Sequence, residues 1–138
     1  MIALAPPQFN DTQIGSRLEA LTAEQLDDLD FGVIGFDGDT VVRVYNRFES
    51  AAAGLRPQSV LGRPLFTEVA PCMNNFMVAQ RFEDAAADPG ADTAAATTGL
   101  DATIDYVLTL RMRPEKVALR LVADPSLKHR YVLVRRRS

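Results

Sequence analysis

Three residues of this sequence are candidates for chemistry, because their side chains can donate a proton or form a covalent bond: Tyr45, Glu49 and Cys72. Cys72 is the only cysteine among 138 residues, and it follows Pro71 in the stretch VAPCMNNF. A single thiol serves in proteins as a small buried hydrophobic group, a catalytic nucleophile or a point of covalent attachment. Tyr45 and Glu49 also have ordinary roles, the first in packing at the end of a strand and the second on an exposed helix face. Each residue on its own leaves these alternatives open.

Catalysis by a cysteine nucleophile requires a nearby base, which is usually a histidine. His129 is the only histidine, and nothing in its local sequence connects it to Cys72. A metal site is disfavoured for the same reason, because His129 and Cys72 are single residues of their types. One cysteine also excludes a disulfide within the chain. We expect neither enzymatic activity nor a bound metal.

The composition predicts one soluble globular domain with one core. The chain is 47% apolar and 24% charged, with a net charge of −3, so it has no overall basic field to attract nucleic acid. The basic run at residues 135–137 is expected to be a solvated strand end. No segment approaches the roughly 20 apolar residues that span a bilayer. The N-terminus lacks the charged leader of a signal peptide, so the expected location is cytoplasmic.

The elements that must position these residues follow from local patterns. The first ten residues, which include Pro6 and Pro7, are expected to form a loose arm. Residues 11–30 predict short amphipathic helices, with a capping box from Thr22 to Gln25. Residues 31–45 alternate and predict two strands that reverse at Asp37-Gly38. Asn46 is expected to cap a short helix that stops at Gly54.

Further along, residues 55–71 predict short helices and turns, because they contain two X-Pro steps and a glycine. Residues 74–87 predict one amphipathic helix with Phe76 on its apolar face, and Asn74 or Asn75 is expected to cap it. The stretch from Ala87 to Gly99 is expected to be a surface loop, and three strands follow. The fold class is therefore α+β, with a five-stranded antiparallel sheet, helices inserted between strands 2 and 3, and a helical N-terminal cap.

With these elements in place, the chain resembles the photoactive yellow protein family, which are blue-light receptors with a PAS fold. The resemblance covers about residues 22–136. It is most specific in the strand pair FGVIGFDGDTVVRVYN, in the Tyr-x-x-x-Glu step that ends at Glu49, and in the VAPC stretch that ends at Cys72.

The resemblance implies a p-coumaric acid chromophore attached to Cys72 as a thioester. It also implies that Tyr45 and Glu49 hydrogen-bond the phenolic oxygen, while Phe66 and Val69 form an apolar wall. A buried phenolate is costly unless several donors meet it, and Glu49 donates only when it is protonated. Loss of that proton after light would leave Glu49 as a buried, unpaired carboxylate, and partial unfolding of the N-terminal helices would relieve the cost.

The sequence departs from the family pattern around this site. Ala53 replaces a Thr, Leu55 replaces an Arg, Leu65 replaces an aromatic residue and Leu110 replaces a Tyr, whereas Met112 matches. These changes make the expected pocket more apolar, and we expect an altered colour, an altered recovery rate, or both.

The resemblance thus predicts a photoreceptor with residues 1–30 as an N-terminal helical cap and residues 31–138 as the PAS-like chromophore-binding core. We expect a monomer or weak dimer that signals to a separate downstream protein. The alternative is a PAS-like ligand-binding or protein-interaction module without photochemistry, and the motive for it is the set of departures at Ala53, Leu55 and Leu110.

Overall fold

The fold is built on one antiparallel sheet, as the sequence predicts. The computed structural model describes residues 6–86, 99–109 and 114–136. The sheet has five strands in the order β2-β1-β5-β4-β3, and every neighbouring pair is antiparallel. The strands are β1 (Gly32–Phe36), β2 (Val42–Tyr45), β3 (Leu100–Leu108), β4 (Glu115–Ala123) and β5 (Arg130–Arg136).

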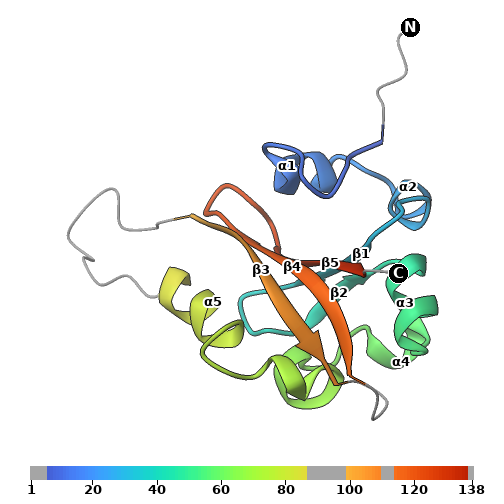
Figure 1. The fold of residues 1–138 in the computed structure, drawn as a ribbon. Helices are drawn as coiled ribbons and strands as arrows, with labels where there is room; N and C mark the ends of the chain where they lie inside the picture. Colours follow the sequence, from blue (N-terminus) through green and yellow to red (C-terminus); the bar gives the residue numbers. More distant parts are fainter. Residues whose placement is uncertain (1–5, 87–98, 110–113, 137–138) are drawn as a thin grey trace, which may run out of the picture.

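Helices cover both faces of this sheet. Figure 1 shows α1 and α2 above the sheet, α3 and α4 at its right-hand side, and α5 at its lower left. The first two helices are α1 (Ile14–Glu19) and α2 (Ala23–Asp27). Between β2 and β3 the chain forms α3 (Arg47–Ala53), α4 (Pro57–Val60), the π-helical turn η1 (Leu65–Val69), the 3-10 turn η2 (Pro71–Met73) and α5 (Ala79–Ala86). The predicted α+β class is confirmed.

Two hydrophobic cores lie on the opposite faces of the sheet. Successive strand residues point to opposite sides, so Val33 and Leu133 enter one core while Ile34 and Val134 enter the other. We call the core that includes Val33 the upper core and the core that includes Ile34 the lower core. The upper core packs against the N-terminal segment, and the lower core packs against the helices between β2 and β3.

Local hydrogen bonds explain where the short helices begin and end. The Thr22 and Gln25 side chains exchange bonds of 2.9 and 3.2 Å with each other's backbone N–H groups, which is the predicted capping box of α2. The Asn46 side chain accepts from the Glu49 N–H at the start of α3. Gly54 ends that helix with a φ of 73°, a conformation that glycine adopts without a Cβ clash.

The helix predicted after Cys72 is shorter than expected at its N-terminal end. The helix expected over residues 74–87 begins only at Ala79, because the Asn75 Oδ1 accepts from the N–H groups of Met77 and Val78 and holds a turn there. Phe76 is therefore not on an apolar helix face, and it is 78% exposed. Apart from Gly99, the predicted loop from Ala87 to Gly99 lies outside the described residues.

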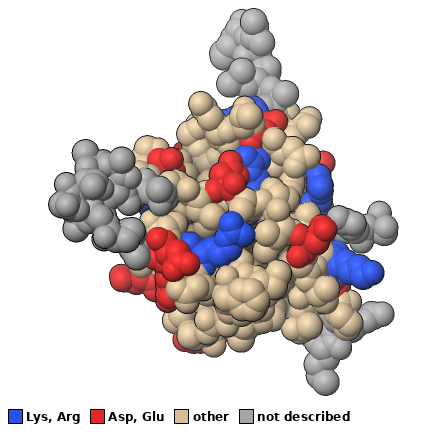
Figure 2. Space-filling view, turned by 60° about the vertical axis from the view of Figure 1, so that its left-hand side comes forward, with Lys and Arg blue, Asp and Glu red and all other residues tan. Residues whose placement is uncertain are grey.

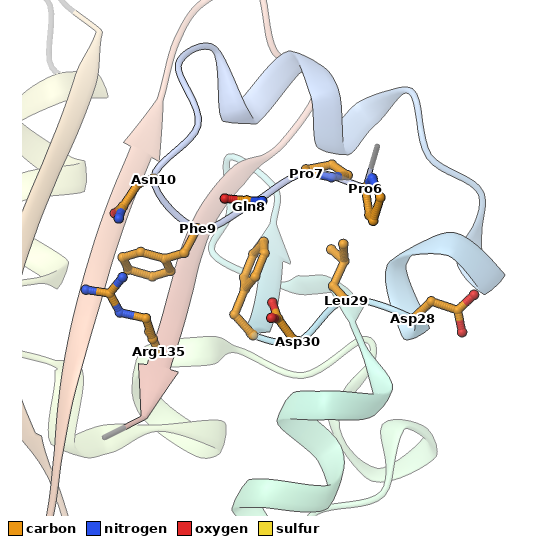
Figure 3. Close-up of a pocket in the computed structure, with 10 residues that line it drawn as sticks. Pro6, Pro7, Gln8, Phe9, Asn10, Asp28, Leu29, Asp30 and Arg135 are labelled. Carbon is orange, nitrogen blue, oxygen red and sulfur yellow. The ribbon is translucent and has the colours of Figure 1, made fainter. Parts of the chain in front are cut away.

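The first ten residues were expected to form a loose arm, but Phe9 is only 5% exposed. Its ring packs edge-on against Phe31 at 5.9 Å between centroids, and the Arg135 guanidinium lies 4.7 Å from its centre (Figure 3). Arg120 donates to the carbonyl oxygens of Phe9 and Asp11 at 2.8 and 2.7 Å. This segment is bound to the upper face of the sheet wherever the structure describes it.

The surface carries both signs of charge. Figure 2 shows acidic and basic side chains interspersed on the face that it presents, with neutral residues between them. None of the helices in the described part of the chain has both the length and the apolar character needed to cross a membrane.

Candidate functional site

Cys72 lies in the short turn η2, where it is partly buried and packs against the lower core. Its backbone carbonyl accepts from the Tyr106 hydroxyl at 2.5 Å and from the Asn75 amide at 3.2 Å. The same amide also lies 2.6 Å from the Tyr106 hydroxyl. These contacts fix the backbone from which the thiol projects. Sequence reasoning gave neither Tyr106 nor Asn75 this role, because the contact with Tyr106 comes from a distant strand.

The predicted apolar wall lies in this core. Leu65 is fully buried, and Phe66 is 6% exposed and packs edge-on against Phe36 at 5.5 Å between centroids. Val69 and Leu55 are partly buried and pack against the same core. The side chains that pack in this core with Cys72 are therefore largely apolar.

Tyr45 is the last residue of β2 and is 7% exposed. It belongs to the same lower core as Leu65 and Phe66, against which Cys72 also packs. Burial raises the pKa of the Tyr45 hydroxyl, and the nearby Glu49 carboxyl raises it further. The hydroxyl therefore keeps its proton at neutral pH and is available as a hydrogen-bond donor.

Glu49 lies in the first turn of α3 and is 1% exposed. Its carboxyl group makes a two-point contact with Arg136, with 2.8 Å from Nη1 to Oε1 and 3.1 Å from Nη2 to Oε2. The third nitrogen of the Arg136 guanidinium, Nε, donates to Glu115 at 2.9 Å. A cation from the end of β5 thus joins a carboxyl from α3 and a carboxyl from the start of β4.

Burial and charge act in opposite directions on Glu49. Burial raises the pKa of Glu49 and is the larger effect, while the hydrogen bonds and charge of Arg136 lower it. Burial lowers the pKa of Arg136, but the hydrogen bonds and charges of Glu49 and Glu115 together raise it by more, so the guanidinium stays charged at every accessible pH. Only Glu49 can change its charge within this pair.

The pair corrects two expectations. An ionised Glu49 was expected to be unpaired, but Arg136 provides a partner for it. The basic run at residues 135–137 was expected to be solvated. Arg135 is exposed, although its guanidinium lies over the Phe9 ring, but the Arg136 side chain is only 10% exposed. Alternation along β5 is the signal that could have found Arg136, since it is two residues beyond the lower-core residue Val134.

Gly32 makes room for Glu49 at the start of β1. A Cβ atom at Gly32 would overlap Glu49 Oε1 and would lie only 3.1 Å from Glu49 Cδ. The carboxyl group therefore rests against bare strand backbone, which only a glycine provides at this position.

The positions where the sequence departs from the family pattern are only partly described. Ala53 is 3% exposed at the end of α3, and Leu55 and Leu65 pack in or against the lower core. Leu110 and Met112 lie outside the described residues. The effect of these departures on a bound group stays a prediction.

His129 is not brought to Cys72. Its ring packs edge-on against Tyr131, whose side chain belongs to the upper core, whereas Cys72 packs against the lower core. Across residues 6–86, 99–109 and 114–136, no cluster of three or more His, Cys, Asp or Glu residues is arranged to hold a metal ion.

Comparison with known proteins gives the site a family context. No protein-family model matches the chain. The photoactive yellow protein of Rhodothalassium salexigens is 29% identical over 114 residues, which cover 83% of this chain and 84% of that protein. The photoactive yellow protein of Halochromatium salexigens is also 29% identical, over 82% of this chain and 83% of its own length.

Solved structures agree with these relatives. The crystal structure of the photoactive yellow protein domain from the sensor histidine kinase Ppr of Rhodospirillum centenum superposes with a TM-score of 0.72. It is 33% identical in sequence, and the match covers 88% of this chain and 98% of that domain. The fold is also shared by a PAS domain of an HTR-like protein from Haloarcula marismortui, which is 18% identical in sequence. That match has a TM-score of 0.56 and covers 90% of this chain and 91% of that domain. The chain therefore has a PAS fold and belongs to the photoactive yellow protein family.

Proposed function

We propose that this protein is a blue-light photoreceptor that carries p-coumaric acid as a thioester on Cys72. The observation that carries the proposal is the placement of Cys72 and Tyr45 on one apolar core, with the buried Glu49 beside Tyr45. This core lies on the lower face of the sheet. Family membership supports a light-sensing PAS module, and the residues of this site support the particular chromophore.

The residues present fit such a group. Cys72 is partly exposed, so an acyl donor can reach it. After its proton passes to water, the Cys72 thiolate would form the thioester with an activated p-coumaroyl ester, and the bond from the acyl carbon to the leaving group would break. The Tyr106 and Asn75 bonds to the Cys72 carbonyl hold the turn in place throughout.

The phenol end would lie at Tyr45 and Glu49. The Tyr45 hydroxyl would donate a hydrogen bond to a phenolate oxygen, and Glu49 would donate a second one when it is protonated. The burial that raises the pKa of Glu49 favours this protonated form. Leu65 and Phe66 are buried in the same core as Tyr45, and such an apolar surrounding would strengthen these bonds.

When bound, p-coumaric acid supplies absorption of blue light and a double bond that light isomerises. The work of this chain's residues is to hold the phenolate and to release one proton from the Glu49 carboxyl. We propose that residues 1–30 form the helical cap that responds to this change of charge. A cytoplasmic location, a monomeric or weakly dimeric state and a separate downstream signalling protein stay predictions.

Reconstitution tests the proposal. The purified protein is treated with an activated p-coumaroyl ester, and its absorbance and intact mass are recorded. We expect a visible band that bleaches in blue light and a mass increase of one coumaroyl group. The Cys72→Ala variant should show neither. A colourless wild-type protein with an unmodified Cys72 would instead favour a PAS-like ligand-binding or interaction module.

The Glu49→Gln variant tests the phenol end. An amide still donates a hydrogen bond but has no proton to release. We expect a red-shifted band and a smaller structural change after light, measured by absorbance and circular dichroism. A variant with the wild-type band and the wild-type change would place Glu49 outside the site.

A further inference from the structure

The contact between Glu49 and Arg136 is built as a specific site. Both side chains are nearly buried, with 2% and 10% of their surfaces exposed. The guanidinium meets both carboxyl oxygens, which is the strongest geometry for this kind of pair. Gly32 keeps the space for the carboxyl group free of a side chain. Three elements, α3, β5 and β1, therefore converge on one ionisable group.

The groups around Glu49 give it one fixed positive charge. Arg136 faces it from β5, Glu115 acts on it from β4, and Tyr45 at the end of β2 interacts with it electrostatically. The Glu115 side chain is 43% exposed, so solvent screens its charge. Arg136 is therefore the group that most favours the carboxylate form of Glu49.

We propose that Arg136 is a positioning residue of the photoreceptor site: it receives Glu49 as a carboxylate after Glu49 releases its proton. This inference rests on the proposed function for the light-driven step. Without Arg136, deprotonation would leave a buried charge with no partner, which is strongly unfavourable. With Arg136, the deprotonated carboxyl has a two-point contact already in place. Arg136 thereby makes the proton of Glu49 transferable.

The chain offers a matched control in the neighbouring residue. Arg135 is of the same type and is adjacent in sequence, but it packs on Phe9 on the upper face of the sheet. Arg135→Gln changes the net charge as Arg136→Gln does, without touching Glu49. Arg136→Lys keeps the positive charge but loses the two-point geometry.

The first experiment uses the protein without chromophore. Glutamate side chains are labelled with carbon-13, and the Glu49 carboxyl signal is assigned by its loss in Glu49→Gln. Its protonation is then followed by NMR as a function of pH. We expect Arg136→Gln to move the titration of Glu49 to higher pH, Arg136→Lys to move it less, and Arg135→Gln to leave it unchanged. An unmoved titration in Arg136→Gln, or an equal movement in Arg135→Gln, overturns the inference.

The second experiment uses the protein after loading with p-coumaric acid. Light-induced infrared differences report loss of the protonated Glu49 carbonyl band. An opposite charge at hydrogen-bond distance alters such a protonation equilibrium by about tenfold or more, so Arg136→Gln should lower the ratio of deprotonated to protonated Glu49 after light by that factor and thereby reduce the band loss. Wild-type band loss in Arg136→Gln overturns the inference while the proposed function stands.

The two experiments separate the two claims. A protein that does not take up chromophore contradicts the proposed function, and the first experiment still decides whether Arg136 controls Glu49. Thermal unfolding checks that each variant is folded. If Arg136→Gln does not fold, the double variant Arg136→Gln/Glu49→Gln removes both charges, and Arg136→Lys carries the titration test.

Discussion

On each face of the sheet, a nearly buried arginine donates hydrogen bonds from two of its nitrogens to one carboxyl group. On the upper face, Arg120 bonds Asp101 at 2.8 and 2.9 Å and also bonds the Phe9 and Asp11 carbonyls. On the lower face, Arg136 bonds Glu49 at 2.8 and 3.1 Å. The two contacts have the same chemistry and nearly the same distances.

The carboxyl partners differ in exposure, and this difference reverses the electrostatics. The Asp101 side chain is 55% exposed, and its bonds to Arg120 lower the pKa of Asp101. The Glu49 side chain is 2% exposed, and burial raises the pKa of Glu49 despite Arg136. The upper pair therefore stays ionised and acts as a fixed attachment for the N-terminal segment. The lower pair contains a group that can change its charge, so geometry alone does not distinguish a structural ion pair from one suited to proton transfer.

The largest expected effect comes from removing the upper arginine. Arg120→Ala eliminates its bonds to Asp101 and to both N-terminal carbonyls, so we expect the free energy of unfolding to fall by about 3 kcal/mol. Urea titration measures this loss. Amide hydrogen exchange should also show faster opening around Phe9. The matched control is Arg63→Ala, which breaks an exposed pair with Glu68 and should cost less than about 1 kcal/mol. Equal losses in the two variants would mean that Arg120 is not a fixed attachment.

A smaller effect is expected when the lower pair is disturbed from the backbone side. Gly32→Ala places a methyl group where the Glu49 carboxyl lies, so we expect a loss of about 2 kcal/mol by urea titration. In Gly38→Ala the new Cβ would have its nearest neighbour at 3.8 Å, and the change should stay within about 0.5 kcal/mol. Combining Gly32→Ala with Glu49→Ala should restore part of the loss, because the overlap is then gone. Strict additivity of the two changes would show that Gly32 does not make space for Glu49.

The smallest effect is a difference in pH dependence between the pairs. The folded pKa of Asp101 lies below 3.8, so its contribution to stability is present above that pH and is lost as the pH falls. The folded pKa of Glu49 lies above 4.5, so its contribution is present below that pH and is lost as the pH rises, by at most about 1.4 kcal/mol per pH unit.

Thermal unfolding of the protein without chromophore, measured from pH 3 upward, tests these opposite slopes. Asp101→Asn should weaken the loss of stability in acid, whereas Glu49→Gln should weaken the decline as the pH rises. The neighbouring charges of Arg136 and Glu115 stay in place in both variants. Slopes of the same sign for Asp101 and Glu49 would contradict the comparison.

Much of the fold follows from the sequence because its signals are local. The alternation of the strands, the Thr22 capping box, the Asn46 cap and the stop at Gly54 each depend on residues within a few positions of one another. The sequence indicated Asn74 or Asn75 as a cap, but the start of α5 at Ala79 was missed, because the apolar period of the preceding residues also fits a helix.

The site could be predicted only in part. Tyr45, Glu49 and Cys72 were found through the family pattern, and the structure places Tyr45 and Cys72 on one core with Glu49 beside Tyr45. Arg136 was missed because its contact with Glu49 joins residues far apart in the sequence, and a run of arginines at a strand end is usually solvated. Only the register of the sheet shows that one of these arginines points inward.

The end of β5 has a consequence for how that register is chosen. Arg135 and Arg136 are identical neighbours that face opposite sides, so a strand shifted by one residue would still offer a guanidinium to each face. The charges of these two arginines therefore do not distinguish the two alignments. Side-chain size does, since the shift would exchange the large ring of Tyr131 with the small side chain of Val132 between two filled cores. The packing of uncharged side chains thus determines which arginine reaches Glu49.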